Sequence, residues 1–208
     1  GTTNVGLFNY TSHLNQLREL LSERNGSRNW NAVKPIIAHA LSFYFMRSGE
    51  WSEVAALLNH RDREVRREAA DALSEPKLVW LRIPNQRSFD TWSDTFDMSP
   101  VIPDLIKRLS DRSKDVRLAV ARALSTRGKE ANGYVDFSLA VPVLIDISSD
   151  KSPVYRLRAA QITQELILDV CHHNHSTFKA IPAASREALA PLIPALKRAI
   201  SGPNKRVR

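Results

Sequence analysis

Residues 111–124 read DRSKDVRLAVARAL, and the last nine of them follow the pattern Val-Arg-x-x-φ-Ala-x-Ala-Leu, where φ is an apolar residue. Val116, Val120, Ala123 and Leu124 recur with the spacing of a helix, so they form one apolar stripe that can face a core. Asp111 precedes this stretch, where a carboxylate can accept exposed backbone N–H groups. The stretch therefore predicts an amphipathic helix with an acidic residue at its start.

The same pattern recurs along the chain. It starts at Val33 with Lys in place of Arg, again at Val65, and in a looser form at Tyr155. Val207 and Arg208 match the first two positions of a further copy. Successive copies start 32, 51, 39 and 52 residues apart. These distances bracket the unit of roughly 40–47 residues that is typical of two-helix solenoids.

An earlier apolar segment precedes three of the copies and carries a proline in register. Pro103, Pro142 and Pro194 each lie 13 residues before the start of the copy that follows. A proline is tolerated in the first turn of a helix, because the backbone N–H there has no partner within the helix. Each predicted pair of helices is too small to bury its own apolar stripe, so the pairs must stack on one another. The sequence predicts an all-α chain of stacked helical pairs.

The pattern resembles the HEAT-repeat family, both in the proline of the first helix and in the Asp…Val-Arg start of the second. The resemblance extends over most of residues 12–208. It implies an α-α superhelix, a HEAT-like solenoid, with about four complete helical pairs and a partial fifth. We expect residues 1–208 to form a single array whose fifth pair begins with a helix over about 185–201. We also expect the array to continue beyond Arg208 in a longer protein.

Residues 76–100 interrupt the repeats after the second pair, and we expect them to form a loop or a small hairpin. Four aromatic residues lie in this insertion: Trp80, Phe89, Trp92 and Phe96. Insertions in solenoids often carry binding contacts, so these four side chains are candidate partner-binding residues. The alternative is that the two tryptophans fold back onto the adjoining helices.

The second position of the pattern is basic in every copy, and two interpretations of this remain open. The residues are Lys34, Arg66, Arg117, Arg156 and Arg208. Stacking would align them in a stripe, which could bind acidic ligands. Alternatively, each could pair with an Asp of its own or the adjacent repeat and hold the stack together.

Further cations surround the turns between the helices of a pair. As candidate partner-binding residues of a basic edge we take Arg63, Arg67, Arg112, Lys114, Lys205 and Arg206. The net charge of +8 also favours acidic partners. The other interpretation of this edge is a solvated surface without a binding function.

The resemblance implies a protein–protein interaction scaffold or adaptor, which would bind an acidic segment or surface through its concave face or its basic edge. Two alternatives remain: a nucleic-acid-associated HEAT module that binds phosphate through the basic edge, or a tubulin-binding array. No glycine-rich phosphate loop and no recognisable nucleophile motif occurs, so we expect neither an enzyme nor a small-molecule substrate or cofactor.

The remaining expectations concern metal, compartment and membrane. The run Cys171-His172-His173-Asn174-His175 crowds one helix end, and no second cluster completes a tetrahedral site, so no metal site is expected. The single cysteine excludes an internal disulfide and suits a reducing compartment, the cytoplasm or the nucleus. The longest apolar stretch, residues 35–46, is too short to span a bilayer, so no membrane insertion is expected.

Overall fold

The computed structural model describes residues 10–22, 28–74, 98–126, 137–177, 187 and 189–201, and within these ranges it contains helices and no strand. The α-helices are α1 (Tyr10–Ser22), α2 (Arg28–Ser48), α3 (Trp51–Leu58), α4 (Arg63–Ser74), α5 (Ile102–Arg108), α6 (Lys114–Thr126), α7 (Val141–Ser148), α8 (Pro153–Thr177) and α10 (Leu192–Ser201). Two short 3-10 helices, η1 (Ser99–Val101) and η2 (Phe137–Leu139), precede α5 and α7. The all-α prediction is confirmed for this part of the chain.

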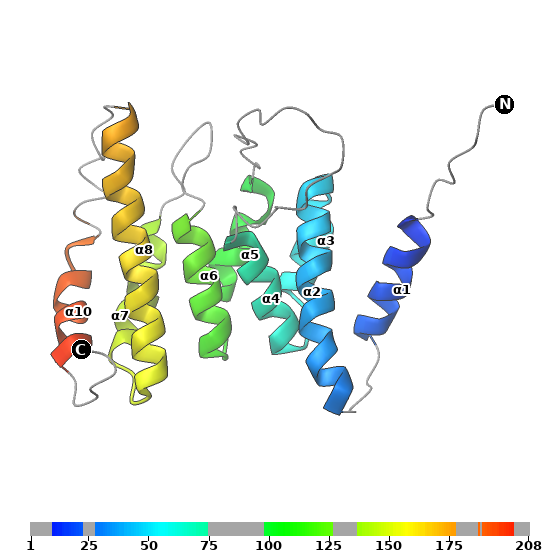
Figure 1. Ribbon diagram of the computed structural model, residues 1–208, viewed down its shortest axis with the longest axis horizontal. Helices are drawn as coiled ribbons and strands as arrows, with labels where there is room; N and C mark the ends of the chain where they lie inside the picture. The colour runs from blue at the N-terminus through cyan, green and yellow to red at the C-terminus, as the bar shows by residue number, and fades with distance from the viewer. Residues whose placement is uncertain are drawn as a thin grey trace.

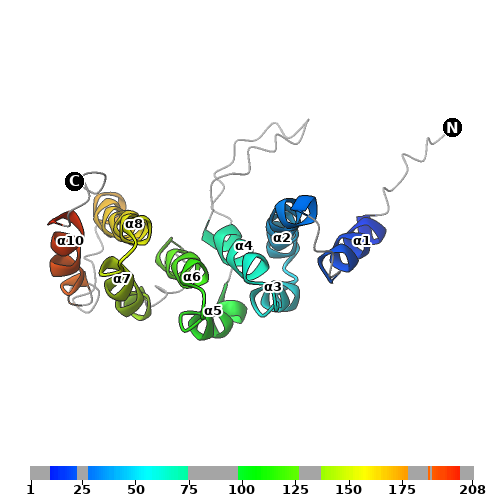
Figure 2. The same ribbon diagram turned by 90° about the horizontal axis from the view of Figure 1, so that it is seen from below.

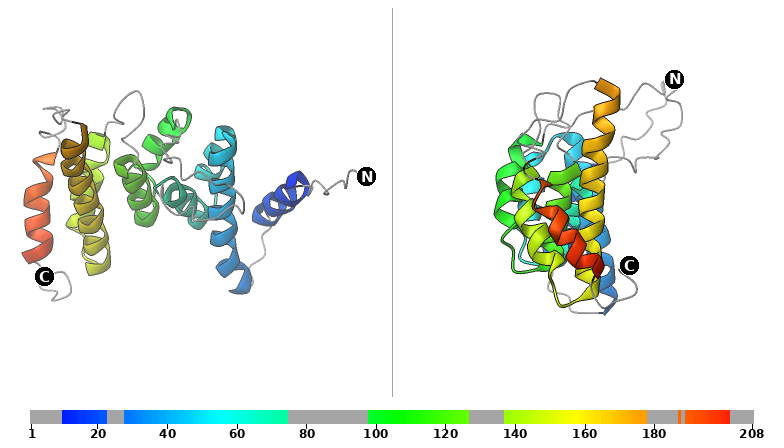
Figure 3. Two further views of the ribbon diagram at one scale, coloured as in Figure 1. Left: turned by 45° about the horizontal axis from the view of Figure 1, so that its top comes forward. Right: turned by 90° about the vertical axis from the view of Figure 1, so that its left-hand side faces the viewer.

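The helices form successive pairs that stack in two layers (Figures 1 and 2). Helices α2, α4, α6 and α8 contact one another in sequence and form what we call the inner layer, since it lies on the inner side of a shallow curve in Figure 2. Helices α3, α5 and α7 form the outer layer. At one end, α10 contacts both α7 and α8 and lies obliquely across them (Figure 3). This packing agrees with the prediction of stacked helical pairs.

The sequence pattern explains which residues are buried between the layers. Val116, Val120, Ala121, Ala123 and Leu124 of α6 are all fully buried, and the matching residues of α4 are buried as well. Burying one Val or Leu side chain contributes about 1.5–3 kcal/mol, so this stripe is a main source of the stability of each pair. The alanines let neighbouring inner-layer helices approach one another closely.

The prolines begin the outer helices as predicted. Pro103 and Pro142 lie in the first turns of α5 and α7. The expected helix over 185–201 is wrong in its extent, because Ala190 and Pro191 form a turn and α10 begins only at Leu192. Pro191 has no N–H to donate, and its ring disfavours a helical conformation of the residue before it.

The insertion lies mostly outside the described residues. Only its last three residues are described: Met98, which is fully buried, and Ser99 and Pro100, which belong to η1. The expected loop or hairpin and its four aromatic residues fall in the part that is not described. No described helix is both long enough and apolar enough to cross a membrane.

Candidate functional site

The basic position of the pattern forms ion pairs between successive helical pairs. We call these three ion pairs the ladder. The distances from side-chain nitrogen to carboxylate oxygen are 2.7 Å for Lys34–Asp62, 2.8 Å for Arg66–Asp111 and 3.1 Å for Arg117–Asp146. In each ion pair, the carboxylate belongs to the helical pair that comes next along the chain after the helix that carries the cation. Of the two interpretations of this position, the structure favours the one in which the cations hold the stack together. The guanidinium of Arg156 instead donates to the backbone carbonyls of Asp150 and Lys151.

The Arg66–Asp111 pair is the most enclosed member of the ladder. Arg66 donates from Nε to Oδ2 of Asp111 at 2.8 Å and from Nη2 to Oδ1 at 3.0 Å. The Asp111 side chain is only 2% exposed and also accepts the backbone N–H of Ser113. Burial raises the pKa of Asp111, but the hydrogen bonds from Arg66 and Ser113 outweigh it, so the net pKa lies below its ordinary value. The carboxylate predicted to cap α6 thus also joins two repeats.

Three described cations of the predicted basic edge have carboxylate partners, and two of them, Arg67 and Lys114, are half-buried. Arg67 pairs with Glu64 and Glu68 on its own helix. Lys114 pairs with Asp150 of the next turn, and its ammonium lies 5.5 Å from the ring centroid of Tyr155. The positive charge available to a ligand at these two positions is therefore reduced.

The other members of the basic edge differ in their placement. Arg63 is exposed and donates to the adjacent Glu64, whereas Arg112 is exposed in the turn before α6. Lys205 and Arg206 lie outside the described residues, as do Trp80, Phe89, Trp92 and Phe96. The described part of the chain therefore does not bring the predicted partner-binding residues together in one site.

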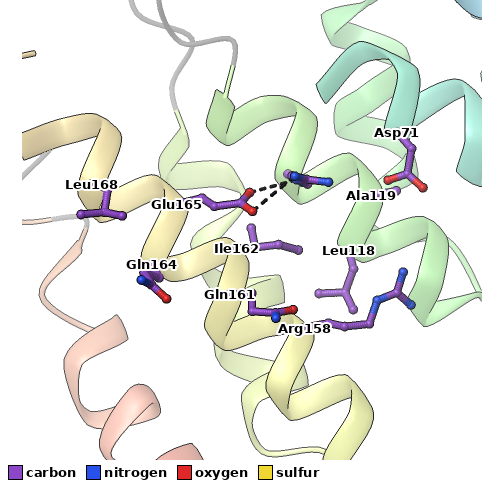
Figure 4. A pocket seen from close by; sticks show the side chains of 10 residues that line it. Asp71, Leu118, Ala119, Arg158, Gln161, Ile162, Gln164, Glu165 and Leu168 are labelled. Carbon is purple, nitrogen blue, oxygen red and sulfur yellow. Dashed lines mark hydrogen bonds and ion pairs between the residues drawn. The ribbon is translucent and has the colours of Figure 1, made fainter. Parts of the chain in front are cut away.

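The inner layer holds a groove of about 410 Å³ between α4, α6 and α8, which we call the inner groove (Figure 4). Its lining residues are Asp71 from α4, Leu118, Ala119 and Arg122 from α6, and Arg158, Gln161, Ile162, Gln164, Glu165 and Leu168 from α8. The groove combines an apolar floor with charged and amide side chains, a composition typical of binding sites in proteins.

Both arginines of the inner groove are already neutralised. Arg122 donates to both carboxylate oxygens of Glu165, at 2.9 and 3.3 Å, which joins α6 to α8 (Figure 4). Arg158 pairs with Asp115 of α6, which also accepts the hydroxyl of Tyr155. These two ion pairs leave no unpaired cation among the residues that line the groove.

Asp71 is the remaining charged residue of the inner groove, and among the described residues no donor hydrogen-bonds to its carboxylate. Burial, followed by repulsion from Glu68, raises its pKa to about 6, although Arg67, Arg158 and Arg122 act in the opposite direction. Its surroundings therefore disfavour the charge that it carries at neutral pH. A carboxylate with a raised pKa in a groove marks a candidate functional site.

The rest of the groove can contact a chain that lies along it. Leu118, Ala119 and Ile162 are buried and form the apolar floor, whereas Leu168 is 46% exposed at one end. The amide side chain of Gln161 is exposed, and that of Gln164 one helical turn later is exposed as well. Such amides can both donate to and accept from a peptide backbone.

The sequence did carry a signal for this groove, and our reading of it missed that signal. Asp71, Arg122 and Gln161 occupy the same position of the repeat, directly after the alanine that all three copies share. Stacking of α4, α6 and α8 brings all three residues into the lining of the inner groove, where Figure 4 labels Asp71 and Gln161. His39 of α2 occupies the same position and contacts Glu68 at 3.2 Å.

Within the described ranges, no group of three or more His, Cys, Asp or Glu side chains could hold a metal ion. The side chains of the His-rich end of α8 are not part of that description. Among the described residues, the inner groove is therefore the best-defined candidate site. Its assignment as a binding site depends on the arrangement of its lining residues. No protein-family model matches the chain, and a search of curated proteins finds no match.

Proposed function

We propose that the protein is a protein–protein interaction scaffold that binds a segment of a partner protein in the inner groove. The observation that carries this proposal is the lining of the groove, in which two exposed glutamines stand beside an apolar floor across three stacked helices. This lining can contact both the backbone and the side chains of an extended segment. Of the two surfaces expected from the sequence, the inner face is thus favoured over the turns.

The charge arrangement favours a protein segment over nucleic acid at this site. Binding to phosphates requires cations that can replace counterions along the ligand. In the inner groove, Arg122 and Arg158 have their own carboxylate partners, and Asp71 adds a negative charge. At the turns, Arg67 and Lys114 are paired with carboxylates as well. Binding of nucleic acid and binding of tubulin remain the alternatives that the experiment below distinguishes.

The proposal predicts that random-sequence peptides selected for binding to the protein occupy the inner groove. The test variant combines Gln161→Ala, Gln164→Ala and Leu168→Ala, which removes three side chains that line the groove. Because alanine is the best helix former, we expect α8 to remain folded. Loss of these contacts should weaken binding of the selected peptides by roughly 10–100-fold, measured by fluorescence anisotropy.

The matched control changes the predicted basic edge instead. Arg63→Ala combined with Arg112→Ala removes two exposed cations and should leave peptide affinity within about twofold. If the control loses affinity and the groove variant retains it, the basic edge is the binding surface and the proposal is wrong. Salt-dependent binding of a DNA duplex or of microtubules that the control variant abolishes would support the corresponding alternative instead.

A further inference from the structure

We infer that the inner groove takes a basic segment, and that Asp71 is the residue that receives a Lys or Arg side chain of the partner. This inference rests on the proposed function and names the class of partner that the groove fits. It also differs from the expectation drawn from net charge, since a chain with a charge of +8 was expected to attract acidic partners.

Most of the charges that line and surround the groove are paired within the protein. Glu165 is paired with Arg122, and Asp115 is paired with Arg158. On α4, Glu68 is paired with Arg67 and contacts His39. Each of these carboxylates has a cation beside it, whereas Asp71 makes no ion pair with any described residue. Once the internal pairs are formed, the local charge that remains is negative.

Asp71 is partly buried and has no hydrogen-bond donor among the described residues. A partly buried carboxylate that lacks donors has lost hydration without replacing it. An incoming ammonium or guanidinium would supply both the opposite charge and the missing N–H donors. The same site would repel an acidic side chain, because Asp71 and Glu165 line the groove and its two arginines are already paired with carboxylates.

The remaining lining residues indicate how such a segment would lie. Gln161 and Gln164 are exposed one turn apart on α8 and can hold the backbone of an extended chain. In Figure 4, Leu168 and Asp71 lie at opposite ends of the pocket. A segment with an apolar residue near Leu168 and a basic residue near Asp71 therefore matches the groove in both polarity and charge.

The experiment uses a library of nine-residue peptides that contains all amino acids except cysteine, selected separately on the wild-type protein and on Asp71→Asn. We expect Lys or Arg to be enriched at one position of the peptides that bind the wild-type protein, and this enrichment to be absent with Asp71→Asn. The best wild-type peptide should bind Asp71→Asn about 10–100-fold more weakly, because a charge-assisted hydrogen bond is lost. Replacing its basic residue by methionine should weaken binding to the wild-type protein similarly and binding to Asp71→Asn little.

A pH titration of the same peptide provides a readout that a purely structural role of Asp71 would not change. With a pKa of about 6, Asp71 loses most of its charge between pH 7 and pH 5. Affinity for the wild-type protein should therefore fall by roughly tenfold over this range. Asp71→Asn leaves the charged groups that face position 71 unchanged, namely Glu68 and Arg67 of α4, Arg122 of α6 and Arg158 of α8. The peptide affinity of this variant should therefore change little between pH 7 and pH 5.

The outcomes separate this inference from the proposed function. If selected peptides require Gln161, Gln164 and Leu168 but show no basic enrichment and bind Asp71→Asn equally well, the groove binds peptides and the inference is overturned. Enrichment of Asp or Glu would likewise overturn it and would point to Arg122 or Arg158 as the contact. If no selected peptide depends on the groove, both proposals fail. The melting temperature of Asp71→Asn should be no lower than that of the wild-type protein, so that a loss of affinity cannot be caused by unfolding.

Discussion

Replacing Asp111 by alanine should lower the free energy of unfolding by about 3–5 kcal/mol, which is the cost of breaking a buried ion pair from one side. The change leaves the guanidinium of Arg66, whose side chain is 13% exposed, without the carboxylate that it contacts through two hydrogen bonds. It also removes the acceptor for the N–H of Ser113 at the start of α6. For a chain of this size the melting temperature should fall by roughly 6–20 °C. Urea unfolding followed by circular dichroism measures the effect.

Asp146→Ala is the matched control, because Asp146 belongs to the same ladder but its side chain is 66% exposed. Its ion pair with Arg117 should contribute at most about 1 kcal/mol to the free energy of unfolding.

The pH dependence of the free energy of unfolding gives a second check. Since the pKa of Asp111 is lowered on folding from 3.8, its stabilisation is present above that value and is lost as the pH falls below it. Equal losses in both variants would contradict the conclusion that the enclosed pair contributes more to stability than the exposed one.

The second large effect has the opposite sign: Asp71→Asn should stabilise the protein at neutral pH by about 1–3 kcal/mol. The pKa of Asp71 rises from 3.8 in the unfolded chain to about 6 in the fold, so the folded state binds the proton more tightly. Each unit of pKa difference corresponds to about 1.4 kcal/mol, and partial exposure reduces the full value. Asparagine has nearly the same shape and carries no charge, so it avoids this destabilisation.

The sign of the pH dependence makes this prediction specific. Ionisation of Asp71 destabilises the fold progressively between pH 3.8 and about pH 6, and the destabilisation is complete above pH 6. The advantage of Asp71→Asn should therefore be greatest at pH 7–8, shrink as the pH falls through 6 and vanish below about 4. Measuring unfolding free energies at several pH values tests this. A gain that does not change with pH, or a loss at pH 7, would show that the carboxylate contributes to folding.

Together the two variants distinguish carboxylates that stabilise the fold from one that does not. Asp111 contributes through Arg66, whereas Asp71 has no such partner among the described residues. A residue that destabilises the fold and lines a groove is a candidate for a role in binding. If Asp71→Asn gains stability and loses affinity for basic peptides, the same substitution supports both parts of that argument.

The sequence by itself determined the helical repeat. The spacing of Val116, Val120, Ala123 and Leu124 predicted a buried stripe, and all four side chains are fully buried. These predictions succeeded because helical periodicity and proline placement are local properties of the chain. The boundary of α10 was wrong because the apolar spacing over 185–201 outweighed Pro191 in our interpretation, whereas in the structure Ala190 and Pro191 form a turn and α10 begins at Leu192.

Only the tertiary structure decided how the charged side chains are used. The sequence left open whether Arg66 serves a ligand or the stack, because its partner Asp111 lies 45 residues away. Arg158 and Asp115 are likewise 43 residues apart, and their pairing is what leaves Asp71 as the residual charge of the inner groove. Ion pairing and burial depend on which helices stack side by side and in which register. A repeat pattern predicts that helices stack, but the pKa of a carboxylate between them depends on every neighbour that the stacking brings near.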